Sequence, residues 1–324
     1  SPSSAASDVY KRQTLHLYNT NLTDSASNSI AHDSVDGSVM VYSRTITVPD
    51  DYPTIQEAIN SASEGDMIYV RKGIYSETII IDKELTIVGE DKYRTVIEGN
   101  MSNYIVVVRG NDVKICGFTV QNAHFVHIRV YGNNCIIEDN LILGAGDEIS
   151  YWGIYLTSYN NTVRKNLVEG CCEGIRIESS SYNKVTENNV INNRYGIIVA
   201  TAYSIPEVPP PPSISNKIYH NSFINNSHQV SDHGLGTIWD DGYPSGGNYW
   251  SDYNGTDFYS GPYQNETGSD GIGDFPYVIG QDIFDNYPLM GPWTPVGENV
   301  TVIPSLKISI TFENVTFPGI TTCN

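Results

Sequence analysis

Arginine and tyrosine side chains recur at one position of a short repeated motif, with Tyr131 and Glu178 two residues further along, and these residue types can recognise polar ligands. The motif is Gly-Ile-x-(Ile, Leu or Val), with copies beginning at Gly153, Gly174 and Gly196 and a degenerate copy at His127. In an extended strand the two apolar residues point to one side and x points to the other. The x residues Arg129, Tyr155 and Arg176 are therefore predicted to stack on one outer surface.

The chemistry that suits this surface is glycan binding. Guanidinium groups offer forked donors to hydroxyls or carboxylates, and aromatic rings offer apolar faces to sugar rings. One residue per coil, at a spacing of roughly 4.8 Å, also matches the scale of a sugar repeat. The candidate glycan-binding residues are Arg129, Tyr131, Trp152, Tyr155, Arg176 and Glu178.

Two other interpretations of this surface stay open. Glu173 and the acids Asp147 and Glu148 lie nearby in the sequence, and two carboxylates at a suitable separation hydrolyse glycosides. Alternatively, the surface is a solvated wall on which arginine and glutamate pair between coils. Convergence of two or three acids with an arginine in one groove would distinguish an enzyme from a binding or spacer module.

A second candidate site is a calcium loop at Asp270 and Asp274. The segment Ser269-Asp-Gly-Ile-Gly-Asp274 resembles half of a calcium-binding loop, in which alternating oxygens surround a hard cation. The loop is incomplete, because Tyr277 occupies the position of the bidentate glutamate. The alternative is a turn held by aspartate side chains. The expected cofactor is therefore either calcium or none.

The elements that position these residues follow from a longer repeat over residues 113–223. Four segments share the template x-x-(Ile or Val)-x-x-Asn-x-(apolar), and a fifth has Phe118 in the Asn position. Successive copies are mostly 22 to 26 residues apart, which is typical of stacked units. Short alternating runs separated by Asn, Gly and Ser indicate strands and turns. The sequence predicts an all-β chain that forms a right-handed, single-stranded parallel β-helix of about seven coils over residues 66–230.

The repeated asparagines are predicted to form a structural ladder at a bend of the coil. They are Asn140, Asn166, Asn188 and Asn221. Asparagine tolerates a left-handed backbone, and stacked amides can hydrogen-bond along the stack. A leucine-rich repeat also uses asparagine, but it requires a helix in each repeat, and these gaps are too rich in asparagine and β-branched residues.

The remaining segments suggest four regions. Residues 1–43 are expected to be an unstructured or truncated leader, and residues 44–233 the β-helix. Residues 234–293 are rich in glycine and aromatic residues, so we expect an irregular C-terminal cap. Residues 294–324 are expected to be the start of a further, truncated β domain or a linker.

One helix is predicted at 53–62, where Thr54 and Glu57 form a capping box. It would cover the open end of the stack. A proline run at 206–212 predicts an exposed loop.

These features resemble a known family. The segment TIQEAINSASEGDMIYVRKGIYSETIIIDKELTIVG is similar to the N-terminal cap and first coils of pectin-lyase-like β-helix proteins. The Asn-rich coils resemble the repeats of the NosD-like, or periplasmic copper-binding, family, and the final aromatic module resembles that of archaeal or bacterial surface proteins. The resemblance covers about residues 44–293 and implies the fold. The resemblance does not indicate a particular activity, because proteins with this fold have many different activities.

The family name implies copper, but the sequence does not support carrying that role over. Copper sites need convergent His, Met or Cys, whereas the histidines and the four methionines are scattered. Signatures of uronan epimerases, pectin esterases and pectate lyases are also missing. The sequence therefore predicts a non-catalytic β-helix module that binds glycans, mediates adhesion or acts as a structural spacer. The alternative is a polysaccharide-active enzyme.

Composition bounds the partners and the location. The formal net charge is −19 over 324 residues, which argues against nucleic acid as a partner. No span suited to direct membrane insertion is visible.

Of five cysteines, Cys116 and Cys135 lie in consecutive coils and either pair or remain free thiols. Eight Asn-x-Ser/Thr sequons favour an extracellular or cell-surface protein. Further domains of a longer parent chain are expected partners.

Overall fold

The fold is known from a computed structural model. It describes residues 10–13, 34–35, 38–145, 152–202, 211–294, 297–305, 308–316 and 318–321. Most of the proline run, the acids Asp147 and Glu148, and Cys323 lie outside the described residues.

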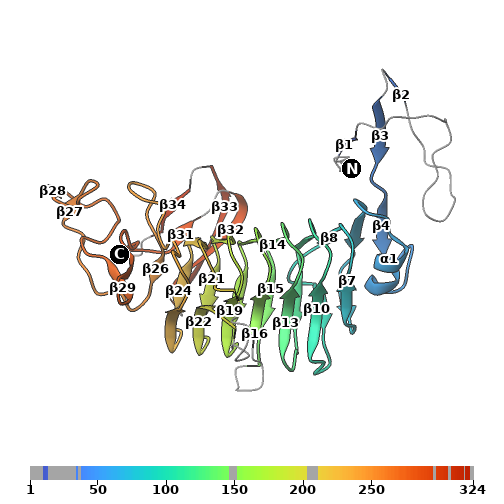
Figure 1. Ribbon diagram of the computed structural model, residues 1–324, viewed down its shortest axis with the longest axis horizontal. Coiled ribbons are helices and arrows are strands. Elements are labelled where there is room, and N and C mark those ends of the chain that lie inside the picture. The colour runs from blue at the N-terminus through green and yellow to red at the C-terminus, as the bar shows by residue number, and fades with distance from the viewer. Residues whose placement is uncertain are drawn as a thin grey trace.

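The chain winds into a right-handed parallel β-helix of about seven coils, as predicted (Figure 1). Three parallel sheets run along the stack, and each coil contributes one strand to each sheet. The first sheet has eight strands: β4 Thr45–Val48, β5 Met67–Val70, β8 Thr86–Gly89, β11 Lys114–Cys116, β14 Ile136–Glu138, β17 Thr162–Arg164, β20 Lys184–Thr186 and β23 Lys217–Tyr219. The second has eight: β6 Gly73–Tyr75, β9 Thr95–Glu98, β12 Thr119–Gln121, β15 Leu141–Leu143, β18 Leu167–Glu169, β21 Asn189–Ile191, β24 Ser222–Ile224 and β26 Tyr249–Trp250. The third has seven: β7 Ile79–Ile81, β10 Tyr104–Val108, β13 Val126–Val130, β16 Trp152–Leu156, β19 Glu173–Glu178, β22 Tyr195–Ala200 and β25 His228–Asp232.

The core consists of apolar columns that run through the coils. In the first sheet, one fully buried residue per strand pairs in register with the next: Ile46, Ile68, Ile87, Ile115, Ile137, Val163, Val185 and Ile218. Because side chains alternate along a strand, a register shift of one residue would turn the whole column into solvent. The repeat spacing therefore fixes which residues face outward.

The predicted asparagine ladder forms inside the stack. The side-chain oxygen of Asn188 accepts hydrogen bonds from the backbone N–H and the side-chain amide of Asn166, each at 3.0 Å. The amide of Asn188 in turn donates to the side-chain oxygen of Asn221 at 2.9 Å and to the carbonyl of Val163 at 2.9 Å. The same pattern joins Asn140 to Asn166. Each ladder residue thus satisfies buried polar groups of two neighbouring coils.

The backbone at this bend differs from the prediction. The left-handed residue is the one before each ladder asparagine, namely Asp139, Lys165, Glu187 and His220, with φ between 52° and 61°. The asparagine itself is absent from the positive-φ positions. The left-handed residue turns the chain from a strand of the first sheet to a strand of the second, and the side chain that follows it is buried inside the stack. This places the amide where it meets its counterparts in the coils above and below.

Two further ladders were not predicted. At another corner the backbone N–H and the side-chain amide of Asn183 both donate to Asn216, and the backbone N–H of Asn161 donates to Asn183 while its amide donates to Ser158. At the third corner, Asn193 bonds to Asn226 in the full pattern. The signal for the first was present in the sequence, because these residues occupy the first position of three aligned repeats. They were missed because that position is a cysteine in the earlier copy, where the backbone N–H of Cys135 donates to Asn161.

Helix α1 (Ile55–Ser61) covers the N-terminal end of the stack, as predicted (Figure 1). Thr54 accepts a hydrogen bond from the N–H of Glu57, as expected for an N-cap. The first coil also caps the helix: the Glu77 carboxylate accepts from the first two helical N–H groups at 2.9 Å, and the Lys83 ammonium donates to the carbonyl of Ala62 at 2.8 Å. The negative charge of Glu77 lies at the N-terminus of the helix and the positive charge of Lys83 at its C-terminus. Both charges therefore interact favourably with the helix dipole and hold the helix on the first coil.

The helix also protects the free edge of the third sheet. The Gln56 side chain accepts from the N–H of Ile80 at 2.6 Å and donates to its carbonyl at 3.3 Å. This side chain stands in for the missing strand beyond β7. Because unpaired strand edges promote pairing with other chains, the contact blocks association at this end of the stack.

The C-terminal cap is irregular and aromatic, as predicted. Trp239 and Trp250 are buried on the last coil, and Trp250 stacks between Phe223 and Tyr277, with ring centres 4.7 and 4.4 Å apart. The cap also holds the short hairpins β27 (Tyr259–Ser260) with β28 (Glu266–Thr267) and β29 (Tyr277–Gly280) with β30 (Ile283–Asp285).

The asparagine ladder ends in this cap on a buried carboxyl group. Asn221 bonds to the side-chain oxygen of Asn248 at 3.0 Å. Asp285, which is fully buried, accepts from the N–H of Asn248 at 2.7 Å and from Trp250 Nε1 at 2.9 Å. Asn248 and Asp285 lie beyond the repeat, so the sequence template did not include them.

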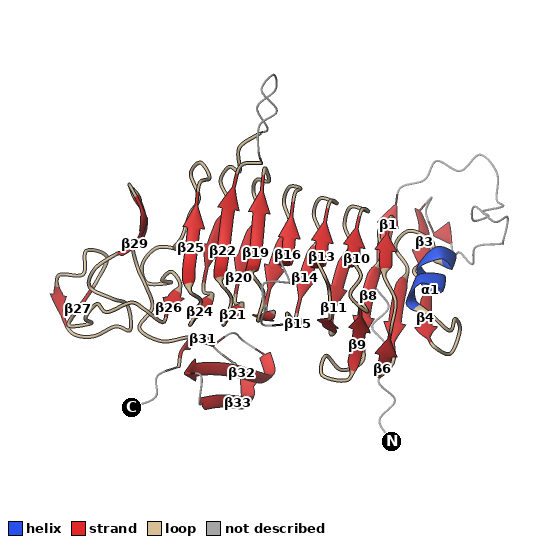
Figure 2. Cartoon of the chain, turned by 90° about the horizontal axis from the view of Figure 1, so that it is seen from below, coloured by secondary structure: helices blue, strands red, loops and turns tan. Residues whose placement is uncertain are grey.

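Two groups of strands lie outside the stack, one near each end of the described chain (Figure 2). Within residues 1–43, expected to be an unstructured or truncated leader, β1 (Tyr10–Gln13), β2 (Ser34–Val35) and β3 (Ser38–Tyr42) form an antiparallel sheet. After the cap, β31 (Trp293–Thr294) pairs with β34 (Gly319–Ile320), and β32 (Gly297–Ser305) with β33 (Ile308–Val315). Cys116 and Cys135 remain free thiols.

Candidate functional site

The outer surface of the third sheet brings the predicted candidates together. Arg129 pairs in register with Tyr155, and Tyr155 pairs with Arg176. The repeat therefore places the three side chains on adjacent strands, β13, β16 and β19, as the motif indicated. We call the outer surface around Arg129, Tyr155 and Arg176 the third-sheet face.

The side chains of this face form a dense network. The guanidinium carbon of Arg129 lies 3.4 Å from the ring centre of Tyr155 and 4.7 Å from that of Tyr131, which are cation–π contacts. Arg176 forms ion pairs with Glu173 at 2.8 Å and with Glu178 at 2.5 Å. The hydroxyl of Tyr155 donates to Glu178.

The expectation that Tyr155 faces solvent is wrong. Only 4% of Tyr155 is exposed, because Arg129 lies over its ring and Trp152 packs against its edge. Arg176 retains 15% of its side-chain exposure. Outward orientation did not give exposure here, because large side chains on neighbouring coils cover one another. Tyr131, at 47% exposure, is the accessible ring of the predicted set.

Burial and pairing also shift the acid–base properties of the face. Burial, reinforced by the hydrogen bond to Glu178, raises the pKa of Tyr155 to about 12. Burial also acts to raise the pKa of Glu178, but the hydrogen bonds from Arg176 and Tyr155 outweigh it and leave that pKa lowered. At neutral pH the network therefore holds a neutral phenol and an ionised carboxylate bound to a guanidinium.

We expect Tyr155→Ala to lower the free energy of unfolding by about 2 kcal/mol, because it removes a buried ring and a hydrogen bond to a charged group. Tyr159, which is 40% exposed on a turn, is the matched control, and Tyr159→Ala should stay within about 0.5 kcal/mol of the parent. Urea unfolding measures both. Equal stability of the two variants would contradict the burial of Tyr155.

The face extends further along the stack than the sequence analysis predicted. Tyr104, Phe125, Trp152 and Tyr155 form a continuous row of edge-to-face contacts, with ring centres 6.3, 4.7 and 4.6 Å apart. Beyond Arg176, Tyr195 stacks on His228 at 4.6 Å. Tyr195 immediately precedes the glycine of the Gly-Ile-x motif, as the predicted Trp152 and the neighbouring acid Glu173 do in their copies. A template that included this preceding position would have found Tyr195.

The acids of the face do not form a hydrolytic pair. Glu173 and Glu178 both bind the same guanidinium, that of Arg176. A glycosidase needs one carboxylic acid to donate a proton and a second carboxylate to attack or activate water. Asp147 and Glu148 lie outside the described residues. The described acids thus fit a binding or structural surface better than a hydrolytic centre.

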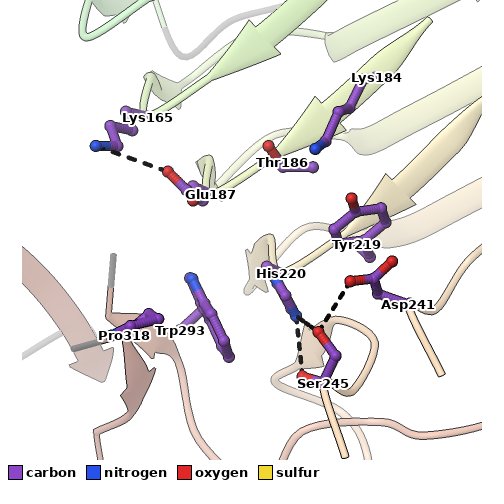
Figure 3. A pocket seen from close by; sticks show the side chains of 10 residues that line it. All are labelled: Lys165, Lys184, Thr186, Glu187, Tyr219, His220, Asp241, Ser245, Trp293 and Pro318. Carbon is purple, nitrogen blue, oxygen red and sulfur yellow. Dashed lines mark hydrogen bonds and ion pairs between the residues drawn. The ribbon is translucent and has the colours of Figure 1, made fainter. Parts of the chain in front are cut away.

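A pocket of about 350 Å³ lies elsewhere, between the outer side of the first sheet and the returning C-terminal chain (Figure 3). It is lined by Lys165, Lys184, Thr186, Glu187, Tyr219, His220, Asp241, Ser245, Trp293 and Pro318. The His220 ring stacks on Trp293, with ring centres 3.6 Å apart and planes within 5°. The sequence did not predict this pocket, because Trp293 reaches His220 only through the fold.

Ser245, His220 and Asp241 in this pocket are not arranged for nucleophilic catalysis. Ser245 Oγ donates to Asp241 at 2.9 Å and lies 3.2 Å from His220 Nε2. A catalytic triad requires the histidine between serine and aspartate, whereas here the serine lies between the other two. Burial lowers the pKa of His220, so its ring is neutral at pH 7.

The predicted calcium loop is closed by hydrogen bonds to the backbone. Asp274 accepts from the N–H groups of Phe258 at 3.0 Å and Tyr259 at 2.9 Å, and Asp270 accepts from the N–H of Ile272 at 3.0 Å. These are the bonds of a turn held by aspartate side chains. Calcium stays a prediction, which requires a calcium-dependent rise in melting temperature that Asp270→Ala abolishes.

The described histidines do not fit a copper centre. His127 lies inside a coil, with Nε2 2.9 Å from the carbonyl oxygen of Leu143 and Nδ1 3.2 Å from that of Trp152. His220 lies in the pocket and His228 on the third-sheet face. In the described part of the chain, no three His, Cys, Asp or Glu side chains come together to hold a metal ion. No described helix is long and apolar enough to cross a membrane.

The chain is similar to a curated cell-surface protein and to solved structures of polysaccharide-active enzymes. A cell surface glycoprotein of Methanothermus fervidus is 26% identical over 62% of this chain and 51% of its own length, so the chain spans about half of that curated relative. Among solved structures, a pectin methylesterase from Aspergillus niger is 15% identical with a TM-score of 0.43, covering 66% of this chain and 84% of that one. An alginate lyase from Paenibacillus is 15% identical with a TM-score of 0.39, covering 64% and 97%.

The family comparison covers most of the β-helix. The matching model is described as periplasmic copper-binding protein (NosD), and it aligns with residues 27–255, well over half of the sequence. By this match the chain is a member of the NosD family.

Proposed function

We propose that this chain is a surface β-helix module that binds an extended glycan along the third-sheet face. A location outside the cytoplasm, at the cell surface or beyond it, fits both the family and the surface glycoprotein relative. The proposal assigns recognition of sugar rings to aromatic side chains and recognition of hydroxyls or carboxylates to Arg129.

The observation that carries this proposal is the continuity of the face. Aromatic and arginine side chains occupy the outer surface of four successive strands, β10 to β19, in contact with one another. Adjacent strands of a sheet lie roughly 4.8 Å apart, so successive sugar units can meet successive coils. A linear polymer suits such a surface better than a compact ligand does.

Arg129 is the residue best placed to bind a ligand. It forms cation–π contacts with Tyr131 and Tyr155, and it makes no ion pair with another described residue. Its terminal N–H groups therefore remain available as donors, while the tyrosine rings hold the guanidinium in place. Arg176, by contrast, is neutralised by two carboxylates.

We expect Tyr131→Ala and Arg129→Ala each to weaken glycan binding by about tenfold, because each removes a contact worth about 1 kcal/mol or more at a preorganised surface. A glycan array on the parent protein identifies the ligand, and titration calorimetry then gives the affinities. Tyr159→Ala removes a tyrosine of comparable exposure, 40% against 47% for Tyr131, from the turn after β16, and this variant should bind as the parent does.

Two results would count against the proposal. The first is a parent protein that binds no glycan on an array that includes neutral and acidic polymers. The second is binding that survives the loss of both Arg129 and Tyr131. Either result would favour the spacer interpretation, in which the face is an internal brace between coils. Copper binding, which the family description names, is not part of the proposal, because the described ligands do not converge.

A further inference from the structure

The asparagines of the sequons are distributed very differently from the other asparagines of the stack. Five of the eight sequon asparagines lie among residues with described burial, and all five are exposed: Asn100, Asn160, Asn225, Asn254 and Asn265. The remaining three, Asn21, Asn299 and Asn314, have no described side chains. Because this fold buries many of its asparagines, the exposure of all five described sequon asparagines is not expected by chance.

The ladder asparagines supply the contrast. Ten of them are buried, and none is the acceptor of a sequon: Asn140, Asn161, Asn166, Asn183, Asn188, Asn193, Asn216, Asn221, Asn226 and Asn248. The reason is geometric for most of them. The second residue after a template asparagine points into the core and is apolar, as Ile142 and Val168 show, so it cannot be Ser or Thr. The repeat therefore separates structural asparagines from acceptor asparagines.

Three of the exposed acceptors share a backbone geometry that projects the side chain. Asn100, Asn160 and Asn225 have φ of 45°, 59° and 51°, in the left-handed region, at turns between strands. None of the three side-chain amides is hydrogen-bonded to another described residue, whereas every ladder amide is. The amide nitrogens are thus free of the contacts that the stack uses.

We propose that Asn100, Asn160, Asn225, Asn254 and Asn265 are N-glycosylation sites that carry oligosaccharides. In the reaction, Nδ2 of the asparagine forms a bond to the anomeric carbon of a lipid-pyrophosphate-linked oligosaccharide. The bond from that carbon to the phosphate oxygen breaks, the lipid pyrophosphate leaves, and Nδ2 loses one proton. The donor lipid and the transferase come from the secretory membrane, and the chain supplies only the acceptor.

The attached sugars would leave the third-sheet face open. None of the five asparagines lies in a strand of the third sheet. Asn160 follows β16 at a turn, and Asn100 and Asn225 lie at turns between the second and third sheets. The inference does not depend on glycan binding by the face, and its test has a separate readout.

The test uses Asn160, because its sequon allows a substitution that spares the asparagine. The chain is secreted from yeast, trimmed with an endoglycosidase that leaves one N-acetylglucosamine on each modified asparagine, and mapped by peptide mass spectrometry. In the parent we expect this mass increment on the Asn160 peptide and on the peptides of the other four sites. Thr162→Val is nearly isosteric and removes the required hydroxyl, so the increment on Asn160 should disappear. Thr162→Ser keeps a hydroxyl and should retain it.

The outcomes separate cleanly. Loss in Thr162→Val together with retention in Thr162→Ser supports the assignment, provided both variants keep the parent's circular dichroism spectrum. Bare asparagine at all five sites, in cells that modify a co-secreted reporter sequon, would overturn it.

Discussion

Asp285→Ala should lower the free energy of unfolding by about 3 kcal/mol, because a buried donor left without an acceptor costs about 1–3 kcal/mol. The substitution removes the acceptor of the N–H of Asn248, of Trp250 Nε1 and of the N–H of Tyr287. It also leaves a cavity where the last coil meets the cap. Urea unfolding followed by tryptophan fluorescence measures the loss. Asp82, which is exposed and does not have a left-handed backbone, is the matched control, and Asp82→Ala should leave stability unchanged within about 0.5 kcal/mol.

The pH dependence of Asp285→Asn tests the same contact in another way. Burial raises the pKa of Asp285 to about 7, against the lowering effect of the Asn248 and Trp250 donors. An unfolded aspartate titrates near about 3.9, so between these values the folded chain holds the proton more tightly. This contribution to stability is therefore present at low pH and is lost as pH rises to about 7. Asparagine lacks it, so the loss caused by Asp285→Asn should be larger at pH 5 than at pH 8. The opposite order would contradict the raised pKa.

Asn188→Ala should cost about 3 kcal/mol or more, because it breaks the ladder in the middle. The change removes the acceptor of two Asn166 donors and leaves the carbonyls of Val163 and Thr186 without their donor. Groups in two coils become unsatisfied together, and a cavity adds to the loss.

Asn189 provides the control for this prediction. It is the same residue type at the next position, and it lies on the outer side of β21 with partial exposure. Asn189→Ala should change stability by less than about 1 kcal/mol. If both variants unfold at the same urea concentration, the ladder contributes nothing specific. A larger effect of Asn188→Asp than of Asn188→Ala is also expected, because aspartate would place a buried carboxylate oxygen against the carbonyl oxygens of Val163 and Thr186.

The direction of the ladder explains why it ends on an acid. In each step the donors belong to the earlier coil and the acceptor to the later one, so the amide dipoles align along the stack. The last asparagine, Asn248, presents N–H groups with no further coil to accept them. A carboxyl group at this positive end supplies acceptors and complements the aligned dipoles, as acidic residues do at helix N-termini. The cap therefore has to supply a hydrogen-bond acceptor for Asn248 as well as an apolar surface for the last coil.

The sequence by itself determined the coil and its register. A repeat near 22 residues with alternating apolar positions leaves one arrangement in which every apolar column is buried, and that arrangement stacks Arg129 on Tyr155 and Tyr155 on Arg176. It also determined the Asn188 ladder and the helix at Thr54, because both depend on local spacing.

Only the tertiary structure decided what depends on neighbours that no repeat encodes. Tyr155 points outward as predicted, but its burial depends on the sizes of Arg129 and Trp152 on the adjoining coils. Asp285 meets Asn248 through an irregular cap, and Trp293 reaches His220 when the chain returns along the stack. Periodicity fixes direction and register, because those follow from backbone geometry. Exposure and closure depend on side-chain volume and on non-repeating loops, so they appear only when the whole chain is folded.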